Sequence, residues 1–173
     1  GEYERALAHY DRVLALEPDA ADAHYNRALV LLTLSRLSPE KNQQMLLDAL
    51  EEWDRDGDCP EIYALICGGA SYMHGKKHEA MLREKAGRLR KTHVIFPGHV
   101  HGTQKQNCFS AADLYMFPSS HESYGLTLME AFQYGLAALT IDHAGARAVM
   151  RPEFGAVATK ETFGAELRRL ARL

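Results

Sequence analysis

Two acidic residues with seven residues between them, Glu122 and Glu130, mark the part of the sequence best suited to chemistry. They flank Gly125, which follows an apolar run and precedes a helical pattern, so it is expected near the start of a helix. There, the turn Tyr124–Gly125–Leu126 offers backbone N–H groups and a positive dipole end to a diphosphate. Carboxylates accept hydrogen bonds from the hydroxyls of a sugar or a ribose. The pattern therefore predicts a pocket for a diphosphate-linked sugar.

Two basic residues upstream could complete this pocket. Arg36 and Lys41 follow the apolar run Leu29–Leu34, where a strand would end. Ligands of open α/β sheets bind at the carboxyl ends of the strands, and cationic side chains placed there neutralise phosphate charge. Simpler alternatives exist for both groups. The two basic residues could be surface charges at the start of a helix, and the two acids could only cap and solvate their own helix.

Apolar runs that alternate with helical patterns predict the elements that position these residues. The runs are Leu29–Leu34, Ile62–Cys67, Val94–Phe96, Leu114–Phe117, Ala138–Ile141 and Phe154–Ala158. Such alternation predicts parallel strands joined by helical crossovers, hence an α/β fold with a Rossmann-like doubly wound parallel sheet. A helix is expected at Pro39–Trp53, and its apolar stripe should pack on the sheet.

The first part of the chain has a different, purely helical pattern. Tyr3, Leu7, Tyr10 and Leu14 recur at steps of four and three, Pro18 ends that helix, and a second helical pattern follows. We therefore expect an N-terminal α-helical hairpin over residues 1–34 and the pocket-bearing domain over residues 35–173. The segment 29–34 can finish the second helix or form the first strand. We favour the strand because an α/β pattern follows it.

The string GEYERALAHYDRVLALEPDAADAHYNRAL resembles a tetratricopeptide repeat. The match runs from the second helix of one repeat into the first helix of the next, so it covers barely one copy, whereas such arrays need about three to bury a continuous core. The resemblance implies a truncated array or a cap, and with it a protein partner. The alternative is a plain amphipathic hairpin.

Composition limits the classes of function. A net charge of −3 argues against binding of nucleic acid, and 46% hydrophobic residues are typical of a globular protein. The three cysteines are widely spaced and suggest a reducing cytoplasm rather than a disulfide framework. No apolar run reaches the roughly 20 residues that a membrane span needs. The chain starts without Met, in the middle of a motif, which we interpret as a fragment.

The pocket sequence resembles the retaining glycosyltransferases of GT-B fold in the large group, also called group 1 or family 4, that includes the sucrose-phosphate synthases. The two glutamates occur within PSSHESYGLTLMEAF, and an Arg-then-Lys pattern five residues apart occurs as SRLSPEKN. Three further segments in matching order are ICGG, IFPGHV and AADLYMFPS. The resemblance covers roughly residues 29–173, which corresponds to that family's C-terminal, donor-binding half.

The resemblance implies roles for individual residues. Glu122 would contact hydroxyls of the donor sugar, Glu130 the ribose, and Arg36 with Lys41 would hold the diphosphate and stabilise charge on the leaving group. Gly98, with His99 and Val100, would lie beside the base. Retention in the family is attributed to same-face attack with the leaving phosphate as base. Neither a protein nucleophile, a cofactor nor a metal is implied, and the nucleotide-diphosphate sugar is a substrate.

Departures from the family pattern leave other functions open. Ser35 replaces a glycine, Ala137 a proline, Ala144 the first of two glycines, and Ala148 a glutamate. A half without its N-terminal acceptor domain should bind a donor but hardly turn over. The alternatives are a repeat-based protein-interaction module with a vestigial glycosyltransferase domain and an artificial junction of two genes near residues 29–36.

Two other clusters are better explained without a metal. Asp54, Asp56 and Asp58 resemble the opening of a calcium loop, but Cys59 and Leu65 stand at positions where that loop needs glycine and glutamate. We therefore interpret the cluster as a solvated turn. His74 and His78 have the spacing of helical metal ligands, but the sequence suggests no third ligand for them.

Overall fold

The computed structural model describes residues 28–122 and 125–172 of the 173-residue chain. Its strands are β1 (Leu29–Leu34), β2 (Ile62–Cys67), β3 (Thr92–Gly98), β4 (Leu114–Phe117), β5 (Ala137–Ile141) and β6 (Gly155–Ala158). Its helices are α3 (Gln43–Asp56), α4 (Tyr72–Ala86), α5 (Gly102–Ala111), α6 (Leu126–Gln133), α7 (Ala144–Val149) and α8 (Phe163–Leu170), with short 3-10 helices η1 (Pro39–Lys41) and η2 (Pro152–Phe154).

The strands form one six-stranded sheet in the order β3-β2-β1-β4-β5-β6. Every pair of neighbours runs parallel. From β1 the chain first builds the sheet outward through β2 and β3, then returns to the other edge of β1 and builds outward through β4 to β6. This is the predicted doubly wound Rossmann-like fold, and its order reverses between β1 and β4, where such sheets bind ligands.

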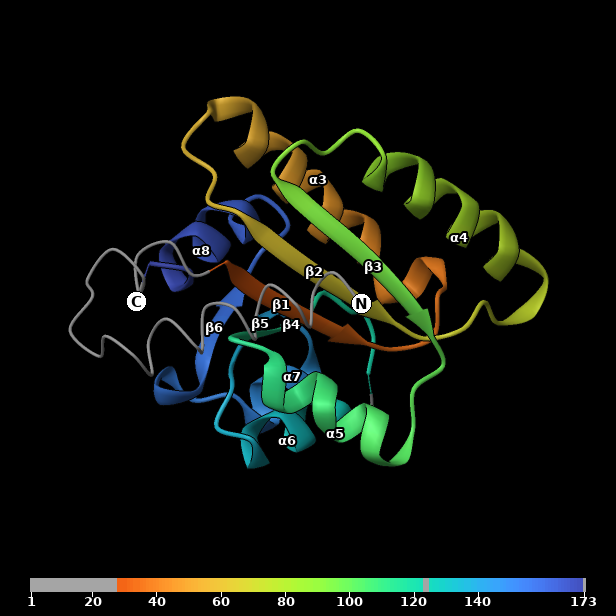
Figure 1. The fold of residues 1–173 in the computed structure, drawn as a ribbon. Coiled ribbons are helices and arrows are strands. Elements are labelled where there is room, and N and C mark those ends of the chain that lie inside the picture. The colour runs from red at the N-terminus through yellow and green to blue at the C-terminus, as the bar shows by residue number, and fades with distance from the viewer. Residues whose placement is uncertain (1–27, 123–124, 173) are drawn as a thin grey trace, which may run out of the picture.

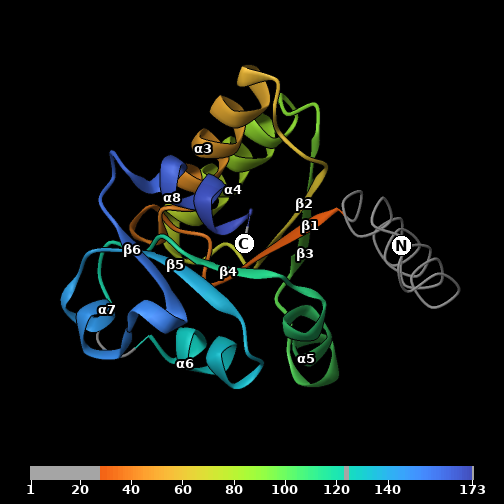
Figure 2. The ribbon, with the colours of Figure 1, turned by 90° about the vertical axis from the view of Figure 1, so that its left-hand side faces the viewer.

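Helices cover both faces of the sheet. α3, α4 and α8 lie on one face, and α5, α6 and α7 lie on the other (Figures 1 and 2). Because side chains alternate along a strand, β1 supplies both cores: Leu31 packs with Trp53 on the α3 side, whereas Leu32 packs with Tyr115 on the α5 side. Burial on both faces explains why β1 is a nearly continuous apolar run.

The contested segment Leu29–Leu34 is a strand, as favoured from the sequence. It pairs with β2 along one edge, with Leu29 opposite Ile62, and with β4 along the other, with Leu31 opposite Leu114. The sheet therefore begins at residue 29, within the range given to the hairpin. Apart from that strand and Ala28, the hairpin expected over residues 1–34 lies outside the described residues.

Some element bounds differ from the sequence-based expectation. The helix expected at Pro39–Trp53 is divided into η1 and α3 by Asn42, which has a left-handed backbone with φ of 54°. Asparagine tolerates this conformation better than most residues. β3 extends at both ends beyond the apolar Val94–Phe96, and Phe154 belongs to η2 rather than to β6.

Asp113 fixes the start of β4 against β1. Its carboxylate Oδ2 accepts the backbone N–H of Val30 at 2.8 Å, and its own N–H donates to the Val30 carbonyl at 2.9 Å. Val30 is almost completely buried, so its N–H needs a partner within the protein. Asp113, directly before the fourth strand, thus joins the two halves of the sheet.

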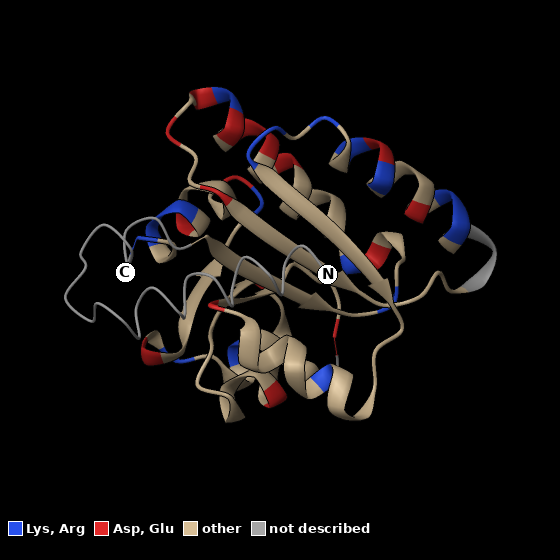
Figure 3. Ribbon diagram, in the orientation of Figure 1, with Lys and Arg blue, Asp and Glu red and all other residues tan. Residues whose placement is uncertain are grey.

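Charged residues of both signs are interspersed along α3 and α4 (Figure 3). Several form ion pairs at the surface, including Arg83 with Glu79 at 2.8 Å and Lys85 with Asp48. Over residues 28–122 and 125–172, no helix combines the length and the apolar character needed to cross a bilayer.

Candidate functional site

The carboxyl ends of β1 and β4 border a cavity of about 350 Å³. Five of the residues selected from the sequence line it: Arg36, Lys41, Glu122, Gly125 and Leu126. The remaining lining residues are Leu34, Ser35, Phe117 and Thr127. The cavity lies at the reversal of the strand order, so the fold brings both basic residues and one acid to the expected edge.

Lys41 and Glu122 form an ion pair across this cavity. Lys41 ends η1 and Glu122 lies in the loop after β4, and their side chains are only 11% and 20% exposed. Arg36 is more accessible, with its side chain 45% exposed and its guanidinium 3.7 Å from Glu40. The cavity is therefore lined by a mostly buried ion pair, Lys41 with Glu122, and by the more exposed cation Arg36.

A buried polar network that sequence reasoning missed holds the turn carrying Arg36. The Gln43 amide donates to the Ser35 hydroxyl at 2.9 Å and to the Arg36 carbonyl at 2.7 Å. Its oxygen lies 3.0 Å from His78 Nε2, so that nitrogen must carry the proton. Burial lowers the pKa of His78, which favours the neutral ring. His78 is thus a positioning residue for the turn.

Gly68 presses the end of β2 against the same turn. Its N–H donates to the Gly98 carbonyl at 2.7 Å, and a Cβ built on it would lie 1.8 Å from the Ser35 carbonyl oxygen. Its φ of 144° also disfavours any other residue. The packing of the site therefore requires the first of the two glycines in the string ICGG.

Gly125 starts α6 in a left-handed conformation, with φ of 56°. Its carbonyl accepts the N–H groups of Leu128 and Met129, and as a glycine this N-cap residue has no side chain with which to cap the helix start. The N–H groups of Leu126 and Thr127 precede these in the first turn and face the region where an anion is favoured. Leu126 itself is 74% exposed, and Tyr124 lies outside the described residues.

The first turn of α7 packs against the backbone of Glu122. A Cβ on Gly145 would lie 2.7 Å from the Glu122 carbonyl oxygen, so only glycine allows this approach. The preceding His143 caps α7, with Nδ1 accepting the Ala146 N–H at 3.1 Å. Its Nε2 is buried and without a hydrogen-bond partner among the described residues. Of the two glycines typical of the family, the chain thus keeps the one that contacts the loop of Glu122.

Glu130 does not line the cavity. It lies one turn further along α6, where its Oε1 accepts the Lys105 ammonium of α5 at 2.7 Å. Its Oε2 is buried and has no hydrogen-bond partner in the described parts of the chain. The two glutamates therefore face different neighbours: Glu122 the cavity, and Glu130 the helix α5. Sequence reasoning did not single out Lys105.

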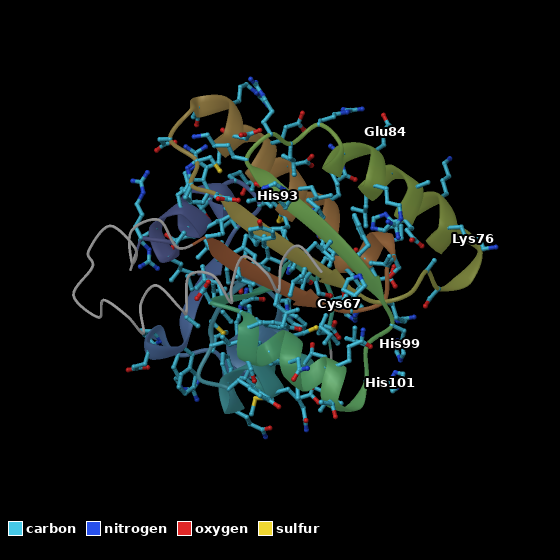
Figure 4. The ribbon with its side chains drawn as sticks, in the orientation of Figure 1. Cys67, Lys76, Glu84, His93, His99 and His101 are labelled. Atoms are coloured by element: carbon cyan, nitrogen blue, oxygen red, sulfur yellow. The ribbon has the colours of Figure 1, made fainter. Side chains whose placement is uncertain are left out.

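The segment expected beside a base lies at the end of β3. Gly98 has φ of 79°, and its carbonyl accepts a hydrogen bond from the Gly68 N–H. Val100 is buried in the core under α5, whereas His99 is exposed. Figure 4 places His99 and His101 near each other where β3 leads into α5, and their ring centroids are 6.0 Å apart. None of these residues lines the cavity itself.

The acidic cluster of the sequence serves the fold. Asp54 accepts the N–H groups of Arg90 and Lys91, Asp56 pairs with Arg168 at 2.6 Å, and Asp58 pairs with Arg172 at 2.7 Å. The carboxylates therefore bind separate partners rather than converging on one point. In the part of the chain that the structure describes, no group of three or more metal-binding side chains comes together.

Curated proteins are similar in sequence to most of this chain. Phosphatidyl-myo-inositol mannosyltransferase of Mycobacterium tuberculosis is 33% identical over 132 residues, which cover 75% of this chain and 32% of the relative. Alpha-monoglucosyldiacylglycerol synthase of Streptococcus pneumoniae is 30% identical over 105 residues, or 61% of this chain and 22% of the relative. The aligned part of the chain thus spans a third or less of the length of these relatives.

Solved structures share the fold. The Anabaena protein Alr3699/HepE, crystallised with UDP-glucose, superposes with a TM-score of 0.71 at 23% identity, covering 95% of this chain and 42% of that protein. The pneumococcal O-GlcNAc transferase GtfA, crystallised with UDP and GlcNAc, gives a TM-score of 0.62 at 22% identity over 83% of this chain and 29% of that protein.

The sequence profile of the family described as glycosyl transferases group 1 matches residues 18–171. The match starts within the segment for which a helical hairpin was expected, and it includes every described element of the sheet. With its GT-B-type fold, its cavity at the β1–β4 edge and this match over most of its length, the chain belongs to the glycosyl transferases group 1 family.

Proposed function

We propose that this chain binds a nucleotide-diphosphate sugar as the donor-binding half of a retaining glycosyltransferase. The observation that carries the proposal is the cavity in which Arg36, Lys41 and Glu122 meet the start of α6. Two cations, a carboxylate and the N–H groups of a helix start, all at one cavity, complement a diphosphate joined to a sugar. The curated relatives include a mannosyltransferase and an alpha-monoglucosyldiacylglycerol synthase, and the Anabaena structure contains UDP-glucose.

In this proposal the diphosphate lies against the N–H groups of Leu126 and Thr127, flanked by Arg36 and Lys41. As the bond between sugar and phosphate breaks, negative charge grows on the leaving phosphate. Two cations and a helix start stabilise that charge. The leaving phosphate accepts the proton of the attacking acceptor hydroxyl on the same face of the sugar, so no protein nucleophile is needed.

The Lys41–Glu122 pair prepares the cavity for both parts of the donor. Without a ligand, each charge satisfies the other in a place with little water. When the donor enters, Lys41 can turn toward the phosphate, while Glu122 accepts hydrogen bonds from hydroxyls of the sugar. Lys41 should therefore matter for the nucleotide alone, whereas Glu122 should matter only when a sugar is attached.

Titration calorimetry with UDP, GDP and ADP, and then with their glucose and mannose conjugates, tests this division of roles. We expect saturable binding of at least one nucleotide, weakened by about 1–3 kcal/mol in Lys41→Met, the range of a lost charged hydrogen bond. Glu122→Gln should leave the affinity for the free diphosphate within about twofold of wild type and weaken the sugar conjugate by about 1–3 kcal/mol.

Lys85→Met is the matched control, because Lys85 pairs with Asp48 between α4 and α3, away from the cavity. It should bind like the wild-type chain. The proposal fails if no nucleoside diphosphate binds saturably, or if Lys41→Met binds as tightly as Lys85→Met while both variants remain folded by circular dichroism.

A further inference from the structure

Cys67 and Cys108 bring two sulfur atoms together from different elements. Cys67 is the last residue of β2 (Figure 4), Cys108 lies in α5, 41 residues further along the chain, and their Sγ atoms are 3.9 Å apart. Cys67 is fully buried, whereas Cys108 packs against the same core and is partly exposed. The third cysteine, Cys59, belongs to the core on the opposite face of the sheet. The fold therefore pairs two of the three thiols, and one of the two reaches solvent.

A disulfide between these two cysteines requires a short movement. Bonded sulfur atoms lie about 2.0 Å apart, so the two Sγ atoms would have to come about 2 Å closer. Backbone hydrogen bonds hold Cys67 in place, because its carbonyl accepts the Ser35 N–H at 3.0 Å and it pairs with Leu34 of β1 and Gly98 of β3. Cys108 lies on a helix of which more than half of the residues are exposed. The movement therefore falls on Cys108 and on α5.

The two thiols differ in a way that suits such a reaction. The Cys67 thiol donates a hydrogen bond to Cys108, and this bond lowers the pKa of Cys108 to about 7. The same hydrogen bond, together with burial, raises the pKa of Cys67. Cys108 is thus partly a thiolate at neutral pH, and the thiolate is the form that attacks a peroxide. Cys67 keeps its proton until its partner has reacted.

We propose that Cys67 and Cys108 are a redox modification site, at which a hydroperoxide makes a disulfide that a dithiol reduces again. With hydrogen peroxide, the Cys108 thiolate attacks one oxygen, so that an S–O bond forms, the O–O bond breaks and hydroxide leaves. This hydroxide takes the proton of the Cys67 thiol, and the Cys67 sulfur attacks the Cys108 sulfur. The S–S bond forms, the S–O bond breaks, and a second hydroxide leaves and is protonated by the buffer. The two sulfur atoms lose two electrons, and the peroxide gains them.

The disulfide would act on the region beside the cavity through α5. This helix follows the segment Gly98–Val100, which was expected beside the base of a nucleotide, and it has to move toward β2 when the bond forms. For a chain that binds a nucleotide diphosphate as proposed, oxidation should weaken the binding about fivefold or more, the lower end of coupling between two sites. Only this effect on binding rests on the proposed function, and the disulfide itself does not.

Thiol counting and peptide mapping test the modification site. Wild type, treated with a small excess of hydrogen peroxide and then unfolded in urea, should keep one reactive thiol of its three, and dithiothreitol should restore all three. Trypsin releases Cys59 and Cys67 in one peptide, residues 56–76. The map is therefore made on Cys59→Ser, in which a peptide linked to Cys108 within one chain can contain only Cys67.

Cys108→Ser and Cys67→Ala are the matched controls, and each should form no disulfide and keep its nucleotide affinity after peroxide treatment. Three results would overturn the proposal: a wild type that keeps all three thiols, a bridge to Cys59 or between two chains, and oxidation of Cys108 to a sulfinic acid without a bridge. A disulfide that forms but leaves nucleotide affinity unchanged would refute the coupling through α5. A reduced chain that binds no nucleotide refutes the proposed function, whereas the thiol count still decides the modification site.

Discussion

Replacing Gly68 by alanine should destabilise the fold strongly, although the change adds only one methyl group. The new Cβ would lie 1.8 Å from the Ser35 carbonyl oxygen and 2.8 Å from the Ser35 carbonyl carbon, so the backbone of one turn must move by more than 1 Å. The φ of 144° adds strain of about 1–3 kcal/mol for a residue with a side chain. Forced repacking of such a contact costs about another 1–3 kcal/mol.

The expected loss is therefore about 2–6 kcal/mol, which corresponds to a fall in Tm of about 4–24 °C for a domain of this size. Gly69→Ala is the control, because a Cβ on Gly69 would have no atom within 4 Å. Urea unfolding followed by circular dichroism gives the two free energies of unfolding. If the free energies of unfolding of the two variants differ by less than about 0.5 kcal/mol, the contact between Gly68 and the turn of Arg36 does not require glycine, and the reasoning is refuted.

Three further perturbations test other parts of the structure. Asp113→Ala leaves the buried Val30 N–H without its side-chain acceptor, so urea unfolding should show a loss of about 1–3 kcal/mol, and a neutral result would contradict that role. Burial lowers the pKa values of His78 and His143, so the unfolded chain takes up protons first as the pH falls below about 6.5; the urea midpoint should therefore be lower at pH 5.5 than at pH 7.5, and a rise on acidification would refute the sign. A hydrogen bond from the Cys67 thiol lowers the pKa of Cys108 to about 7, whereas burial raises the pKa of Cys59 to about 11. Iodoacetamide at pH 7.5 should therefore modify Cys108 first, and the Cys108→Ser variant should lack the fast phase of the reaction. Equal reaction rates at Cys108 and Cys59 would refute this prediction.

The fold could be predicted from the sequence because each buried strand is a short apolar run. β1, β2 and β4 have the expected bounds, since the interior of a parallel sheet leaves little place for polar side chains. The predicted bounds of an element were wrong where the backbone conformation of a single residue sets its end. Asn42 breaks the expected helix by adopting a left-handed backbone, which the apolar stripe of α3 does not reveal.

Only those residues of the site that belong to short sequence motifs could be predicted from the sequence. Arg36, Lys41, Glu122 and Gly125 lie within short strings at strand ends, and the topology brings strand ends together. Gln43, His78 and Lys105 act through partners 7 to 35 residues away. A single sequence contains no local pattern for such contacts, because they depend on how neighbouring helices are packed.

The position of β1 has a consequence for how the chain folds. This strand comes first among the described strands yet lies at the centre of the sheet, with β2 on one edge and β4 on the other. During synthesis, one edge can be covered once residues 62–67 emerge, but the other stays open until residues 114–117 have been made. An apolar strand with an open edge can pair with another chain. The nascent protein is therefore most exposed to aggregation while its middle third is being made, and this edge closes only after Asp113 and the strand that follows it have been made.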